Sequence, residues 1–279
     1  MRNKISSLVF GLFVFSFTLF GCLGCVSISK PSSKIIKTTT GNVIKKESTL
    51  FPIQSFVITH QTFVLQSKIC DKNQNCETHV VAQVGGTASG VIIETDSPNS
   101  YILTAGHVCV PGQPNVSIPG ELIVSYQIKL MTGYGRAAEA DLIAVDPEND
   151  LCLLSTPQYL GPGLKIQNTK TNLHSKVYNM ANPSGLATSL AVPVFEGFYA
   201  GRVSNRDMYT VPGVPGSSGS PIMNDKNEII TIISAAAIKF DEFVICPTTE
   251  SIREFLLANL PIKKKETLVD KVKKRLDSK

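Results

Sequence analysis

The sequence predicts an all-β fold, built as two β-barrels or as a sandwich and followed by one C-terminal helix. Valine, isoleucine and threonine are plentiful, tryptophan is absent, and the 279 residues include 20 glycines and 16 prolines. This composition favours strands joined by turns over a helical bundle. Short apolar runs also recur at near-regular spacing with turn residues between them, as in barrels and sandwiches. The chain is long enough for one large domain or two small ones.

The apolar runs form two halves, separated by a break at 157–162 that contains two prolines. Order is expected to begin near Phe51. The predicted strands of the first half are 55–59, 62–65, 79–84, 85–93, 101–105, 120–131, 138–145 and 151–154. Those of the second half are 176–180, 195–203, 208–211, 221–223, 228–237 and 242–246. Residues 249–259 contain a capping residue and an apolar face, and therefore predict a helix that closes the domain.

Residues 1–25 are predicted to be a secretory signal that is separate from the domain. Arg2 and Lys4 precede an uncharged apolar run that is too short for a comfortable membrane span. The run ends at Leu19-Phe20-Gly21-Cys22, which resembles a bacterial lipobox, so Cys22 is the candidate lipidation site. Cys25 offers a competing register, and an uncleaved anchor or ordinary secretion are further alternatives. Each alternative exports the domain, either to the membrane of the bacterial cell envelope or into the medium.

Basic segments flank the predicted domain at 51–260. Residues 26–50 are rich in Ser, Thr, Lys and Pro and show no helix or strand period, which predicts a flexible tether. The tail at 261–279 holds eight basic and three acidic side chains. Basic arms suit an anionic membrane surface, with a solvated linker and tail as the alternative. A nucleic-acid partner is not expected, because the basic residues lie in end segments without interleaved aromatics.

The seven cysteines suit an exported protein. Cys70 and Cys76 bracket a polar turn between two strand-like runs, so a disulfide stapling a hairpin is a candidate there, with two exposed thiols as the alternative. Cys109, Cys152 and Cys246 lie in apolar surroundings, where we expect small buried thiols, although their pairing is left open. No cysteine spacing suggests zinc, and the sequence predicts neither a metal nor a cofactor.

Three segments contain residues that could act together as a nucleophile and its base. The heptapeptide at 215–221 places Ser218 among glycines, which permit a sharp bend that gathers N–H groups beside the hydroxyl. His107 follows a strand and a glycine, and Asp150 precedes an apolar run. Separately, the three are ordinarily a plain turn, a structural histidine and a turn or cap residue. Their chemistry links them, because a serine hydroxyl needs a base and the base needs a third group to hold it.

These segments together resemble the chymotrypsin-fold (trypsin-like) serine proteases. They are Leu103-Thr104-Ala105-Gly106-His107, Asp146-Pro147-Glu148-Asn149-Asp150-Leu151-Cys152-Leu153-Leu154 and Gly216-Ser217-Ser218-Gly219-Ser220-Pro221. Residues 146–152 and Ala181-Asn182-Pro183-Ser184-Gly185-Leu186 are more similar to the protease domain of bacterial high-temperature-requirement (Deg-type) proteases. The resemblance covers about residues 84–258 and implies two six-stranded antiparallel β-barrels, at about 51–157 and 163–247, with the active site between them.

The resemblance also implies a role for each site residue. His107 would be the general base and then the general acid, Asp150 would fix its tautomer, and Ser218 would attack the scissile carbonyl. The N–H groups of Gly216 and Ser218 would form the oxyanion hole. Ser234 resembles the strand serine that supports the buried aspartate.

The chain departs from the family pattern at three points. Ser217 stands where an acid or amide often orders the loop after zymogen activation, so we expect activity without pro-peptide cleavage. Pro212 occupies the position that is acidic in trypsin-like enzymes, which favours a small or apolar substrate side chain over Lys or Arg. The sequence after Leu260 is too short for a PDZ domain, and none is expected.

We interpret the sequence as that of an exported, membrane-anchored serine endopeptidase acting on polypeptides. One alternative is a catalytically silent protease-fold module that binds peptides or a protein partner. A second alternative is an esterase that uses the same three residues.

Overall fold

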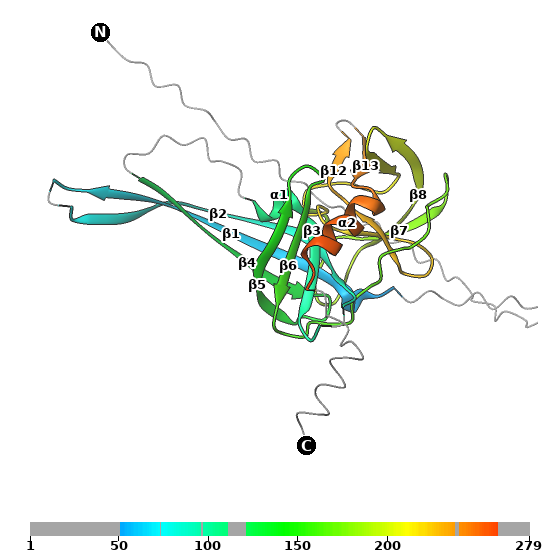
Figure 1. Cartoon of the computed structure of the whole chain (residues 1–279), viewed down its shortest axis with the longest axis horizontal. Helices are drawn as coiled ribbons and strands as arrows, with labels where there is room; N and C mark the ends of the chain where they lie inside the picture. Colours follow the sequence, from blue (N-terminus) through cyan, green and yellow to red (C-terminus); the bar gives the residue numbers. More distant parts are fainter. Residues whose placement is uncertain (1–50, 73, 96, 111–120, 238–239, 262–279) are drawn as a thin grey trace, which may run out of the picture. The chain divides into compact units, whose positions relative to one another are not determined.

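The computed structural model describes residues 51–72, 74–95, 97–110, 121–237 and 240–261. Within these residues the chain forms two β-sheets, two short 3-10 turns, a one-turn helix and a closing helix (Figure 1). The predicted all-β class with a C-terminal helix is confirmed. The predicted signal with Cys22 and Cys25, the tether and most of the basic tail lie outside the described residues. No helix in the described part is long and apolar enough to cross a membrane.

The first sheet is a closed six-stranded barrel, as predicted. Its strands are β1 (Phe56–Cys70), β2 (Cys76–Ile93), β3 (Ser100–Ala105), β4 (Glu121–Thr132), β5 (Ala137–Asp146) and β6 (Leu151–Thr156), in the order β1-β2-β3-β6-β5-β4. Every residue of β3 and β6 is buried, because both faces of these strands are covered. Ile102 and Leu154 point into the barrel, whereas Leu103 and Leu153 belong to a second apolar cluster outside it.

Three strands of this barrel continue past it as an arm (Figure 1). β1 pairs with both β2 and β4 along nearly its whole length, whereas β3 reaches β2 only at 91–93 and β5 reaches β4 only at 128–131. We define the arm as residues 62–70 of β1, 76–87 of β2 and 121–127 of β4. The predicted separation between strands 55–59 and 62–65 was wrong, because polar His60 and Gln61 both keep strand partners on either side.

The second sheet curls back on itself but contains seven strands instead of the predicted six. They are β7 (Lys176–Met180), β8 (Val194–Val203), β9 (Arg206–Tyr209), β10 (Pro221–Met223), β11 (Ile229–Ile232), β12 (Ala235–Ala237) and β13 (Phe240–Cys246), in the order β11-β10-β7-β8-β9-β13-β12. The two end strands, β11 and β12, are separated by only Ile233 and Ser234. At these residues the chain changes partner, since Ile233 donates to Ser220 and Ser234 donates to Ile245. One predicted strand, 228–237, is therefore divided into two.

The closing helix α2 (Thr249–Asn259) begins after Thr248, whose side chain accepts a hydrogen bond from the Ser251 N–H. Its apolar face, formed by Ile252, Phe255 and Leu256, packs into the cluster that contains residues of β3, β6 and β11. The helix thus joins the two sheets through apolar contacts. The remaining short elements are η1 (Ile53–Ser55), α1 (Gly106–Cys109) and η2 (Pro183–Gly185).

Two disulfides are present among the described cysteines. Cys70 and Cys76 join β1 to β2 at the tip of the arm, with an S–S distance of 2.02 Å. Cys109 and Cys152 also pair, which corrects our expectation of buried thiols at these positions. The two lie 43 residues apart in sequence, and α1 packs against β6 and brings them together. Cys246 is a buried free thiol, as expected.

Candidate active site

The structure brings His107, Asp150 and Ser218 together, as the resemblance implied. His107 lies on α1 directly after β3, Asp150 lies one residue before β6, and Ser218 lies in the turn before β10. The Nε2 atom of His107 is 2.9 Å from the Ser218 Oγ, and its Nδ1 atom is 3.1 and 3.0 Å from the two Asp150 oxygens. The three side chains form one continuous hydrogen-bonded chain.

The Asp150 carboxylate is fixed by donors from both halves of the domain. The backbone N–H of His107 donates to Oδ1 at 2.8 Å, and the Ser234 hydroxyl donates to Oδ2 at 2.5 Å. The Asp150 carbonyl accepts from the Gly106 N–H at 2.9 Å. Asp150 adopts a φ of 56°, a conformation that surrounding contacts must hold in place for a non-glycine residue.

The N–H groups of Gly216 and Ser218 are the candidate oxyanion hole. Among the described residues, the N–H groups of Gly216 and Ser218 have no hydrogen-bond acceptor, while their carbonyls accept from Ser89 Oγ and Ser89 N, each at 2.8 Å. The orientation of the two N–H groups is set by the preceding carbonyls, because each N–H points opposite to the carbonyl of the same planar peptide. The Pro215 carbonyl accepts from the Ser184 N–H and the Ser217 carbonyl from the Ser220 N–H, so the N–H groups of Gly216 and Ser218 are left available for an anionic oxygen. Gly216 has a φ of 93°, and a Cβ there would collide with the Asn182 carbonyl. Only glycine fits this position.

Comparison with known protein families identifies the family of this chain. The family model for the trypsin-like peptidase domain matches residues 88–232, which is more than half of the chain. The chain belongs to the trypsin-like peptidase family. No curated protein sequence matches it. The predicted family and the chymotrypsin-like fold are thereby confirmed.

Two solved structures share the fold of this trypsin-like peptidase. The serine endoprotease from Yersinia pestis superimposes with a TM-score of 0.52 at 19% identity, over 74% of this chain and 62% of that one. The HtrA-type protease AlgW with tripeptide gives a TM-score of 0.51 at 18% identity, over 71% of this chain and 59% of that one. The peptidase thus spans less than two thirds of the length of these structures, and the likeness establishes the fold.

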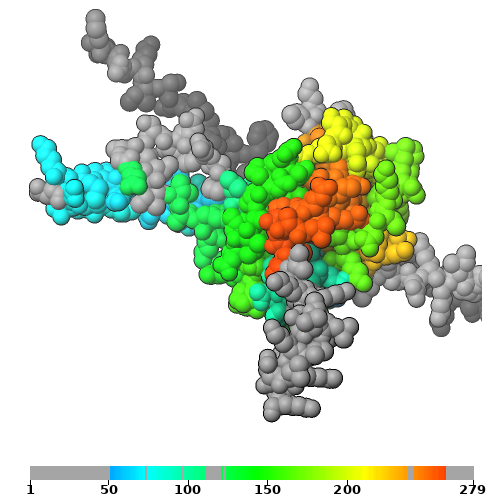
Figure 2. All heavy atoms as spheres, viewed as in Figure 1, coloured from blue at the N-terminus to red at the C-terminus, as the bar shows by residue number. Residues whose placement is uncertain are grey.

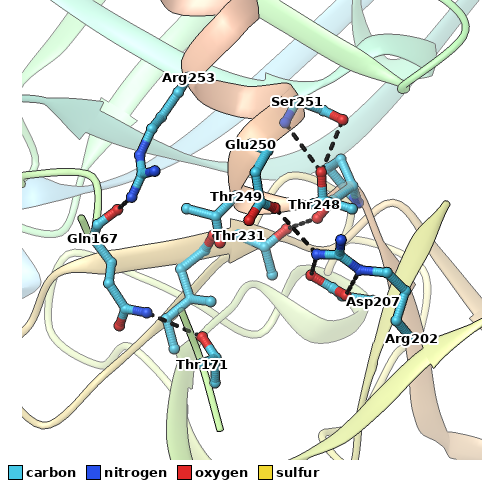
Figure 3. A network of polar contacts seen from close by, with 12 residues as sticks. Gln167, Thr171, Arg202, Asp207, Thr231, Thr248, Thr249, Glu250, Ser251 and Arg253 are labelled. Carbon is cyan, nitrogen blue, oxygen red and sulfur yellow. Dashed lines mark hydrogen bonds and ion pairs between the residues drawn. The ribbon is translucent and has the colours of Figure 1, made fainter. Parts of the chain in front are cut away.

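A hairpin of the second sheet also holds the turn before Asp150. Arg206 of β9 donates from Nη1 to the Asn149 carbonyl at 2.9 Å and from Nη2 to the Glu148 carbonyl. The adjacent Asp207 is buried and accepts from Arg202, which also bonds Glu250 at the start of α2 (Figure 3). The hairpin that presents Arg206 is therefore tied to the closing helix.

The nucleophile loop is ordered without an acid at Ser217. The Ser217 N–H donates to the Val214 carbonyl at 2.9 Å, and its carbonyl accepts from Ser220 at 3.0 Å. Its Oγ is buried and has no partner among the described residues. The Ser184 N–H also donates to the Pro215 carbonyl at 2.6 Å. Backbone contacts thus order this loop, and the Ser217 side chain contributes no hydrogen bond.

The loop before the nucleophile packs closely against β12 and β13. Pro212 is half-buried, and its neighbour Gly213 is buried. A Cβ at Gly213 would lie 2.5 Å from the Val244 Cγ1 and 3.0 Å from the Ala236 Cβ. A side chain at position 213 would therefore collide with β12 and β13, and the backbone next to Pro212 packs directly against these strands.

The hydrogen bonds set opposite protonation preferences for His107 and Asp150. Burial raises the pKa of the Asp150 carboxyl, but hydrogen bonds from the His107 ring, Ser234 and the His107 N–H outweigh it and hold this pKa below its usual value. The hydrogen bond to Asp150 raises the pKa of His107 above its ordinary value, although burial acts in the opposite direction. As a result, Asp150 is ionised, and the His107 imidazole next to it is readily protonated.

Sequence reasoning missed three features that hold the site together: Ser89, Arg206 and the Cys109–Cys152 disulfide. Ser89 lies in a glycine-flanked strand entry, and Arg206 begins β9 directly after a hairpin turn, so neither position shows a motif. The sequence does contain a signal for the disulfide: Cys109 follows His107 by two positions, and Cys152 follows Asp150 by two positions. The supporting Ser234, in contrast, lies where the resemblance implied.

Asp150→Asn should lower the pKa of His107, because the carboxylate is the largest cause of its increase. The imidazole would then lose its proton at a lower pH than in the native chain. Titration of the histidine ring signals by NMR measures this midpoint, with His60, His79 and His174 as internal references. An unchanged midpoint would show that Asp150 does not set the protonation of His107.

Proposed function

We propose that this trypsin-like peptidase is an exported serine endopeptidase that cleaves polypeptides through Ser218, His107 and Asp150. The observation that carries the proposal is the hydrogen-bonded chain from Ser218 Oγ through the His107 ring to Asp150. The N–H groups of Gly216 and Ser218, which have no acceptor among the described residues, add to it. Acyl transfer to serine requires a nucleophile, a base that is held by a third group, and a site that binds the anionic oxygen.

In this mechanism, His107 Nε2 takes the hydroxyl proton while the Ser218 Oγ attacks the scissile carbonyl carbon. The carbonyl oxygen becomes anionic and accepts hydrogen bonds from the N–H groups of Gly216 and Ser218. The protonated His107 then gives its proton to the leaving amine, and an ester to Ser218 remains. A water molecule, deprotonated by the same imidazole, hydrolyses this ester and restores the free hydroxyl.

The proposed role of Asp150 follows from charge. The imidazolium that forms during each step is stabilised by an adjacent carboxylate, and the His107 Nδ1–H bond to Asp150 leaves Nε2 free to accept the serine proton. Hydrolysis therefore requires neutral His107 at the start. Because its pKa is raised, kcat/KM should increase with pH through that raised pKa.

Ser218→Ala should abolish labelling by a fluorophosphonate probe and lower kcat by about 10³-fold to 10⁶-fold. Ser217→Ala is the matched control, since the Ser217 Oγ has no hydrogen-bond partner in the described part of the chain, and it should keep its labelling. Mass spectrometry of the labelled peptide and hydrolysis of casein measure the two effects. A folded native chain that takes up no label would instead support the silent, peptide-binding alternative.

For specificity, we propose that the side chain before the scissile bond enters the space beside Pro212, and that Ala236 and Val244 keep this space short. Substrates with Ala or Val at that position should be cleaved at least about tenfold faster than those with Lys or Arg. Val244→Ala should extend the preference to larger apolar side chains. Cleavage of a proteome-derived peptide library measures both, and a preference for basic residues would contradict the proposal.

We also propose that Cys22 carries a lipid that attaches the domain to the cell envelope. The apolar run ending at Cys22 supports this. Cys22→Ala should move the protein from the membrane fraction to the soluble fraction when it is expressed in a bacterium, as immunoblotting of the fractions would show. Cys25→Ala is the matched control for the competing register. Membrane retention of the Cys22 variant alongside release of the Cys25 variant would assign lipidation to Cys25.

A further inference from the structure

The strand β2 has one long edge on which no other described strand lies. β1 covers the first edge of β2 from Cys76 to Val91. β3 covers the second edge only at 91–93. From Cys76 to Ala88 this second edge therefore exposes backbone groups that can pair with an added strand.

The hydrogen bonds of Ser89 reveal which residues of β2 face this open edge. The Ser89 N–H donates to the Ser218 carbonyl, and the Ser89 carbonyl accepts from Thr104 Oγ1 at 2.7 Å. Both groups of Ser89 therefore point away from β1. In an antiparallel pair every second residue has the same orientation, and the register is regular from Ser89 back to Ala82. Thr87, Gly85 and Gln83 therefore also direct their N–H and C=O groups outward.

Most of this open edge lacks the usual protection against pairing. Exposed edges are normally blunted by charged residues or proline; Glu77 lies near the tip of the arm, but residues 80–88 contain neither. Apolar side chains are instead exposed along it, with Val80 at 63% and Val84 at 55% of full exposure. Figure 2 shows this part of the chain, in cyan, standing out from the first barrel. The edge is thus suited to an uncharged, extended polypeptide.

We infer that residues 80–88 of β2 form an exosite, a binding surface outside the cleft, which takes an extended segment of the polypeptide substrate as an added β-strand. The inference rests on the proposed function. A substrate segment is the expected occupant because the open edge is continuous with the active site: it begins beside Ser89, whose N–H donates to the Ser218 carbonyl. At about 3.3 Å per residue, nine residues extend roughly 30 Å from the nucleophile. Unfolded chains can follow this edge, whereas short peptides end before it.

The test compares prolines placed on the two edges of the arm. Gln83→Pro removes an N–H that points outward from β2. Val124→Pro is the matched control, because Val124 lies opposite Leu65 in β4 and, by the same alternation, points its N–H outward on the other edge. Thermal unfolding checks that both variants fold. Val84→Lys is the second variant, which keeps the backbone and places a charge on the edge.

Binding is measured in the Ser218→Ala background, by fluorescence anisotropy with a labelled, reduced and carboxymethylated polypeptide and with a hexapeptide. Gln83→Pro and Val84→Lys should each weaken polypeptide binding about tenfold relative to hexapeptide binding, and Val124→Pro should not. When the same two β2 substitutions are made in a chain that keeps Ser218, the kcat/KM for the polypeptide divided by the kcat/KM for the hexapeptide should fall by the same factor.

Three outcomes would overturn the exosite: equal effects of Gln83→Pro and Val124→Pro, no effect of either β2 variant, or dissociation of a dimer by Gln83→Pro with polypeptide binding unchanged. The last would assign the edge to a second copy of the chain. Failure of the proposed function gives a different result, namely no fluorophosphonate label and no hydrolysis while the Gln83 effect on binding persists.

Discussion

Burying a carboxylate costs free energy unless donors replace the water around it, and the Asp150 carboxylate of this peptidase is only 19% exposed. Its donors come from the His107 backbone and ring and from Ser234. Because Ser234 belongs to the second sheet, this one carboxylate is satisfied only when both sheets are assembled. The order of the proposed site is therefore coupled to the packing of the whole domain.

Ser89 is another polar contact between the two halves, and it helps to order the nucleophile loop without an acid at Ser217. Ser89 binds the carbonyls of Gly216 and Ser218 and accepts from the Asn182 N–H at 2.9 Å. One serine in the first barrel thus binds three backbone groups in two segments of the second half. The same strand continues outward as the open edge of the arm, so the strand that holds the nucleophile loop also carries the inferred exosite.

Much of the fold could be predicted because its signals are local. Apolar runs, turn residues and the capping residue of α2 placed most strands and the closing helix, and the flanking motifs identified His107, Asp150 and Ser218. The length of β1 and β2 was not predictable, since polar His60 and Gln61 interrupt the apolar pattern while the backbone ladder continues. Nor was the division at Ile233 and Ser234, which depends on a change of strand partner.

By itself, the sequence determined the fold class, the family and the residue types of the proposed site, because these follow from composition, periodicity and contiguous motifs. Only the tertiary structure decided which donors surround Asp150, which cysteine pairs with Cys109, and that Ser89 holds the loop of Ser218. It also decided which edge of β2 stays open. These are pairings between residues far apart in the chain, and hydrogen-bond partners across strands are chosen by the packing of the whole domain.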